Sequence, residues 1–206
     1  MRVILLILFY AVLSQNSLAF QIDLKYTIES IDIKEREFLN INCDFGEKQI
    51  DSLKKYSNPD KNFSITVPGD YIIYEQETGD SIFSLIIDNP KISFKKMSIL
   101  NIIEFSQRNA KEQFLLDYFI LQGDTILNKN IITGKSRLNN QNCYWIKYKY
   151  LTNEHEIKYS CVIYIRNLIS NRNFIFNITG FDEEYFEQYL CQYKTIIKSV
   201  KWVNNE

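Results

Sequence analysis

The sequence predicts an α+β fold in which an antiparallel β-sheet is covered by two amphipathic helices, as in an α/β/α sandwich. Apolar and polar residues alternate over short segments, with the period of half-buried strands. Turn signals at residues 68–70 (Pro-Gly-Asp) and 78–81 (Thr-Gly-Asp-Ser) separate successive segments, so neighbouring strands are expected to pair antiparallel. Residues 106–123 and 182–200 place apolar side chains at steps of three and four. Such helices bury their apolar stripe against a sheet.

The first nineteen residues have the pattern of a secretory signal peptide. Arg2 precedes an apolar stretch at residues 3–13, and Ser17 and Ala19 supply the small residues of a signal-peptidase site, so we expect cleavage after Ala19. The stretch is shorter than the roughly 20 residues of a spanning helix, although an uncleaved N-terminal anchor is the alternative. We therefore expect a secreted or periplasmic protein that is not an integral membrane protein once the signal peptide is removed.

The remaining chain divides into two parts. Residues 20–58 form an N-terminal extension, in which residues 45–56 have apolar side chains at helical spacing and are expected to form a short helix. A turn-forming cluster at residues 58–62 then leads into an α+β domain at residues 59–206.

Within this domain we expect four strands, a helix, four more strands and a final helix. The predicted strands are residues 63–67, 71–77, 82–88, part of 92–103, 125–133, 143–151, 156–166 and 173–179. Ser106 is expected to cap the first helix, which ends at Gly123, and Asp182 to cap the second. Trp202 is expected to pack at the sheet edge where the chain leaves the helix, since burying an indole contributes about 3 kcal/mol. The C-terminal part of the final helix carries cations that complement its dipole: Lys194, Lys198 and Lys201.

The order of these segments resembles the PsbP-like fold family over residues 62–202. The resemblance is carried by the opening strand FSITVP at 63–68, the YII at 71–73, the helix ending at Gly123, the ITG at 132–134, the YKY at 148–150 and the closing IIKSVKW at 196–202. The resemblance implies the same α+β fold. It also implies a binding or assembly role, because members of this family are mostly non-enzymatic.

Four cysteines in a chain that enters an oxidising compartment favour two disulfides. If the hairpin around Asn153 has a three-residue loop, Cys143 lies directly opposite Cys161 and can pair with it. Cys43 and Cys191 would then pair and tie the N-terminal extension to the final helix. A loop two residues longer that stays centred on Thr152 keeps this register, a four-residue loop destroys it, and free buried thiols are the alternative.

The sequence contains no recognisable catalytic site. Its only histidine, His155, lies in a predicted turn, and the carboxylates at residues 182–184 are those expected at the start of a helix. No nucleotide-binding, hydrolase or zinc-protease motif occurs, and the cysteine spacing matches no zinc site. We therefore predict no catalytic residue, no cofactor and no metal. Removing Arg2 with the signal leaves 23 of the 24 basic residues against 25 acidic ones, which argues against a nucleic-acid partner.

Aromatic residues are dense in the second half of the chain. Because strand side chains alternate between faces, Tyr144 and Tyr148 cannot share a face with Trp145. The three-residue-loop register places Trp145 opposite Tyr159, so these two are candidates for an aromatic strip that binds a peptide, a glycan or an apolar ligand, unless both faces are covered.

We predict a secreted or periplasmic, non-catalytic binding or assembly module whose partner is another protein or an envelope component. The alternatives are a carrier of a small apolar ligand and a hydrolase with an unfamiliar site. A pocket of converging polar groups would favour an enzyme, an enclosed apolar cavity a carrier, and a flat or edge surface a binding module. Sequons for N-glycosylation begin at Asn62 and Asn177.

Overall fold

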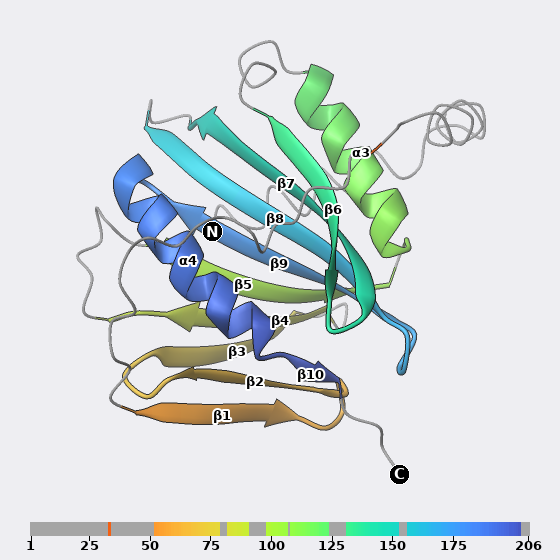
Figure 1. The fold of residues 1–206 in the computed structure, drawn as a ribbon, viewed down its shortest axis with the longest axis vertical. Coiled ribbons are helices and arrows are strands. Elements are labelled where there is room, and N and C mark those ends of the chain that lie inside the picture. Colours follow the sequence, from red (N-terminus) through yellow and green to blue (C-terminus); the bar gives the residue numbers. More distant parts are fainter. Residues whose placement is uncertain are drawn as a thin grey trace. The chain divides into compact units, whose positions relative to one another are not determined.

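Two antiparallel sheets form the computed structural model of this chain (Figure 1). The structure describes Ile33 and residues 52–78, 82–90, 98–106, 108–123, 131–152 and 156–202, all within the unit Ile33–Glu206. The described elements are, in chain order, β1 (Leu53–Asn58), β2 (Phe63–Pro68), β3 (Ile72–Thr78), β4 (Ile82–Asp88), β5 (Ser98–Phe105), α3 (Ala110–Gly123), β6 (Ile132–Leu138), β7 (Gln141–Leu151), β8 (Ile157–Asn167), β9 (Arg172–Gly180), α4 (Glu183–Lys198) and β10 (Lys201–Trp202).

The larger sheet has the strand order β3-β4-β5-β9-β8-β7-β6, and the smaller has the order β1-β2-β10. Every described strand pair is antiparallel, as the tight turns predicted. The sequence predicted one sheet, whereas the structure has two. The chain leaves the small sheet after Pro68 and enters the large sheet at Ile72.

One face of the large sheet carries the main hydrophobic core, to which α4 and the small sheet both contribute. The Phe63 ring of β2 packs against Phe83 of β4 and Phe174 of β9, with ring centroids 5.9 and 5.6 Å apart. On α4, the Phe186 ring stacks on Tyr159 of β8 at 5.8 Å.

Helix α3 packs on the opposite face of the large sheet. Its Phe114 ring lies 5.4 Å from Tyr144 of β7 and 5.8 Å from Tyr164 of β8. Tyr164 alternates along β8 with Ile163 and Ile165, which belong to the core on the α4 side. Because neighbouring strand residues point to opposite faces, the two helices lie on opposite faces of this sheet.

The N-terminal part of the fold corrects a predicted helix. Leu53–Asn58, whose first residues fall in the predicted helix at 45–56, is strand β1; residues 45–51 lie outside the described residues. Burial along β1 alternates with a period of two. Tyr56 packs on Phe63, and Lys54 donates a hydrogen bond to the Tyr71 carbonyl oxygen, so partners in β2 and beyond decide the local structure.

The start of α3 corrects the predicted cap at Ser106. The Glu112 N–H donates to Asn109 Oδ1 at 2.9 Å, and the Asn109 N–H donates back to Glu112 Oε2 at 3.3 Å. This reciprocal pair is a capping box, and Ser106 has no acidic residue three positions later to form one. At α4 the predicted cap is confirmed, because Asp182 Oδ1 accepts the Tyr185 N–H at 3.1 Å.

The strand predicted at residues 125–133 starts later, as β6 (Ile132–Leu138); residues 124–130 lie outside the described residues. Asn139 and Asn140 both have positive φ, 49° and 64°, in the two-residue turn that joins β6 to β7. Such a turn suits an antiparallel hairpin and fixes its register.

Trp202 packs where the chain leaves α4, as expected. It pairs with Phe63 across β10 and β2, and its ring lies 5.3 Å from Phe174. Ser199 supports this arrangement, because its hydroxyl oxygen accepts the Thr66 N–H at 2.8 Å and lies 3.1 Å from the Thr66 carbonyl oxygen. None of the helices described is both long and apolar enough to span a membrane.

We expect Trp202→Ala to reduce stability by about 2–3 kcal/mol, because it removes the ring contact with Phe174. In a chain of this size that lowers the melting temperature by roughly 5–10 °C, which circular dichroism measures. Trp202→Phe keeps an aromatic ring and should lose less than half as much. An unchanged midpoint for Trp202→Ala would show that this contact contributes nothing.

Candidate functional site

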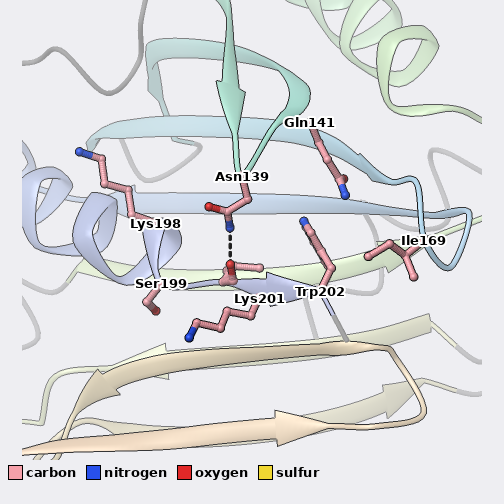
Figure 2. Close-up of a pocket in the computed structure, with 8 residues that line it drawn as sticks. Asn139, Gln141, Ile169, Lys198, Ser199, Lys201 and Trp202 are labelled. Atoms are coloured by element: carbon pink, nitrogen blue, oxygen red, sulfur yellow. Dashed lines mark hydrogen bonds between the residues drawn. The ribbon is translucent and has the colours of Figure 1, made fainter. Parts of the chain in front are cut away.

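A pocket of about 340 Å³ opens where α4 ends and β10 begins (Figure 2). We call it the β10 pocket. Its walls come from the β6–β7 turn, the start of β7, the β8–β9 turn and the segment that joins α4 to β10. The lining residues are Asn139, Gln141, Ile169, Lys198, Ser199, Val200, Lys201 and Trp202.

Local hydrogen bonds hold two of these walls together. The Asn139 side chain, on the positive-φ turn, donates to the Val200 carbonyl oxygen. The Ser199 N–H caps α4 by donating to carbonyl oxygens of its last turn, including Ile196 at 3.0 Å. The shape of the pocket is therefore set by the backbone of a helix end and a tight hairpin.

Two polar groups of the pocket are buried without a partner. Gln141 is only 7% exposed, and its Oε1 atom accepts no hydrogen bond within the described part of the chain. The buried Trp202 Nε1–H likewise has no acceptor there. Figure 2 shows the Gln141 amide and the Trp202 indole nitrogen directed toward the same space. A buried polar group without a partner costs about 1–3 kcal/mol, so a polar molecule at this position would be stabilised.

The charged residues of the pocket lining are both lysines. Lys198 and Lys201 are exposed, and none of the described lining residues is a carboxylate that would balance them. Lys194 lies one turn earlier on α4. Its burial, and secondarily the Lys198 cation, lower the pKa of Lys194. This end of the molecule therefore favours an anionic group.

An apolar tip lies beside the pocket. Leu168 and Ile169, in the β8–β9 turn, are 68% and 50% exposed. Asn167 Oδ1 accepts the N–H groups of Ile169 and Ser170 at 3.0 and 3.4 Å, an Asx turn that presents the two apolar side chains outward. In the sequence, the sign of this tip is a pair of large apolar residues, Leu168 and Ile169, between two predicted strands.

The pocket offers binding groups but no catalytic pair. None of its described lining residues is a histidine, a cysteine or a carboxylate that could act as a base. The Ser199 hydroxyl contacts the Ile196 carbonyl oxygen at 2.6 Å as well as the backbone of Thr66. The described residues also contain no cluster of three or more metal-ligating side chains.

The aromatic strip predicted at Trp145 and Tyr159 does not form. The register pairs Trp145 with Ile163 and Tyr159 with Lys149. Trp145 is only 6% exposed and covers Gly134, its partner in β6. Tyr159 stacks on Phe186 and its hydroxyl donates to Glu183 at 3.1 Å, so it covers the N-terminal turn of α4.

The predicted Cys143–Cys161 disulfide is also wrong. The β7–β8 pairing ends at Leu151 and Ile157, so the loop is centred two residues later than assumed. Cys143 therefore lies opposite Ile165, and Cys161 opposite Lys147.

Both cysteines are free thiols buried in the core. Burial raises the pKa of each, most strongly for Cys161, and keeps it protonated near neutral pH. Cys191 is buried on α4, but Cys43 lies outside the described residues, so the Cys43–Cys191 pair stays a prediction.

The other singled-out residues add no chemistry to the site. His155 and the predicted signal peptide at residues 1–19 lie outside the described residues. Asp182, Glu183 and Glu184 form the N-terminal cap and first turn of α4, as their spacing predicted.

Comparisons with known proteins support the fold only. No protein-family model and no curated protein matches the chain. A solution structure of the cyanobacterial PsbP protein (CyanoP) from Synechocystis is similar, with a TM-score of 0.51 and 14% identity over 76% of this chain and 96% of that chain. The Ran-binding protein Mog1p of Saccharomyces cerevisiae has a TM-score of 0.45 and 12% identity, over 74% of this chain and 96% of its own. LpqN of Mycobacterium tuberculosis, involved in cell envelope biogenesis, has a TM-score of 0.37 and 10% identity, over 74% of this chain and 84% of its own. The likeness to CyanoP shows that this chain has a PsbP-like fold, as the sequence resemblance predicted.

We expect Gly134→Ala to destabilise the protein by about 1–3 kcal/mol, because a Cβ there would lie 2.7 Å from the Trp145 ring. Gly123→Ala is the matched control, since nothing described lies within 4 Å of its added Cβ. Chemical denaturation should show a loss for the first variant and no loss for the second. Equal effects would mean that the close approach of Trp145 is not what requires glycine.

We expect the native protein to resist thiol reagents and to expose two reactive thiols after unfolding without reductant, at Cys143 and Cys161. Non-reducing peptide mapping should recover Cys43 linked to Cys191. A linkage that includes Cys143 or Cys161 would contradict the β7–β8 register, and four alkylated thiols would contradict the remaining disulfide.

Proposed function

We propose that this chain with a PsbP-like fold is a secreted or periplasmic, non-catalytic binding module that docks a protein partner over the β10 pocket. The observation that carries the proposal is the buried, unpartnered polar pair of Gln141 and Trp202 beside an exposed apolar tip. Secretion rests on the signal pattern of residues 1–19.

A protein partner suits this surface because it combines two kinds of contact. Leu168 is 68% exposed and lies outside the pocket lining, and Ile169, which lines the pocket, is still 50% exposed, so a small ligand within the pocket would leave Leu168 uncovered. Protein interfaces bury apolar side chains at their centre and satisfy polar groups around them, and tryptophan is enriched in such interfaces. A partner that covers the tip can also insert a polar group into the pocket.

The alternatives fit the same surface less well. A carrier of an apolar ligand needs an enclosed apolar cavity, whereas the β10 pocket is open and its lining combines apolar surface with two amides, two lysines and a serine. A hydrolase needs a nucleophile paired with a base, whereas the Ser199 hydroxyl is hydrogen-bonded to backbone groups of Ile196 and Thr66.

Site-specific photo-crosslinking in the envelope or medium of the native host tests the proposal. A crosslinker at Ile169 should trap a partner, and one at Ile120 should not, since Ile120 is equally exposed at 49% but lies on α3 across the large sheet. The trapped protein, purified, should bind Leu168→Asp at least about tenfold more weakly than wild type, and Ile120→Asp equally well. Trapping from Ile120 only, or from neither position, would contradict docking at this pocket.

A further inference from the structure

We propose that the β10 pocket takes the carboxylate of an aspartate or glutamate in an extended acidic segment of the partner. This inference rests on the proposed function, because it specifies which group of the partner enters the pocket. It follows from the hydrogen-bond partners that the two unpartnered groups need, from the charge of the lining residues and from the size of the pocket.

One of the two buried groups needs a hydrogen-bond acceptor, and the other needs a donor. An indole N–H only donates, so Trp202 needs an acceptor, and a carboxylate oxygen is the strongest one that a protein offers. Gln141 Oε1 accepts, so it needs a donor such as a backbone N–H. One acidic residue in a peptide supplies both groups, whereas acetate leaves Gln141 unpaired and an apolar ligand leaves both unpaired.

The charge of the pocket selects an acidic residue over its amide. Lys198 and Lys201 line the pocket, and the described lining residues contribute no negative charge. Both lysines are exposed, so their attraction for an anion acts over about 8–10 Å and weakens with salt. A neutral asparagine or glutamine side chain would gain none of this attraction.

The volume admits a small group, such as one acidic side chain, rather than a large ligand. About 340 Å³ is at the lower end of the roughly 300–1,000 Å³ of ligand pockets. Residues that flank the acidic one would leave the pocket and meet Leu168 and Ile169. The segment that fits is therefore an acidic residue next to an apolar one.

Nuclear magnetic resonance of the indole N–H groups tests this directly, because the chain has two tryptophans and Trp202→Phe assigns the signals. The full mature chain is titrated with the blocked tetrapeptides Gly-Leu-Asp-Gly and Gly-Leu-Asn-Gly, with acetate and with inorganic phosphate, at equal ionic strength. We expect saturable movement of the Trp202 signal with the aspartate peptide and at least about tenfold weaker binding of the asparagine peptide.

Each other outcome overturns a stated part of the inference. Equal binding of both peptides would exclude the carboxylate, and acetate or phosphate binding as tightly as the aspartate peptide would exclude the peptide. No movement with any probe would show that solvent alone satisfies these groups.

Three variants assign the effect to the pocket. Lys201→Glu should weaken binding of the aspartate peptide about tenfold or more, while Lys111→Glu, an equal charge change at an exposed site on α3, should not. Gln141→Leu should weaken the peptide several-fold and leave acetate binding unchanged, because only the peptide has the N–H that Gln141 would accept. Equal loss in the two lysine variants would mean that net charge alone drives binding.

The two proposals fail separately. If Ile169 traps a partner but the aspartate peptide does not bind, the docking surface stands and its acidic ligand is wrong. If the peptide binds and Ile169 traps nothing, the pocket recognises carboxylates without serving as the partner's docking site.

Discussion

The packing of Phe63 against the large sheet is the contact on which the rest of the structure depends. Its ring contacts Phe83 and Phe174, so the small sheet closes one end of the core that α4 covers elsewhere. Trp202 packs on Phe174 from β10, beside Phe63 in the small sheet. The chain must therefore leave α4 abruptly and enter β10 within a few residues. That sharp change of direction places a helix end, a strand edge and two hairpin turns around one pocket.

Most of the large sheet could be predicted because its signals are local. Alternation and turn residues located β3, β4, β8 and β9 to within a residue or two, and Asp182 located the start of α4. The errors arise where partners distant in sequence decide. Leu53 and Tyr56 lie at helical spacing but pair with β2, and the polar strand β6 shows no alternation because it forms the edge of the large sheet.

The candidate site was less predictable for a physical reason. Gln141 and Trp202 are 61 residues apart, and neither residue type signals a site in sequence. Their juxtaposition depends on the turn at Asn139 and Asn140 and on Ser199 ending α4. The pairing of the cysteines was hard to predict for a similar reason, because it depends on the register of two strands. A hairpin centre displaced by two residues moved the partner of Cys143 by four, from Cys161 to Ile165.

The unpartnered groups of the β10 pocket differ from ordinary packing defects because of where they lie. Each could be removed without disturbing the backbone, since an apolar side chain at position 141 would not need a hydrogen bond and a phenylalanine at 202 would still pack on Phe174. The chain instead places a donor and an acceptor together, in a pocket that two lysines also line and beside Leu168 and Ile169. Polar groups that destabilise the fold because they lack partners within the chain are expected at surfaces that bind another molecule. Trp202 needs a hydrogen-bond acceptor, Gln141 needs a donor, and the lysines favour a negative charge. An acidic residue in a peptide supplies all three.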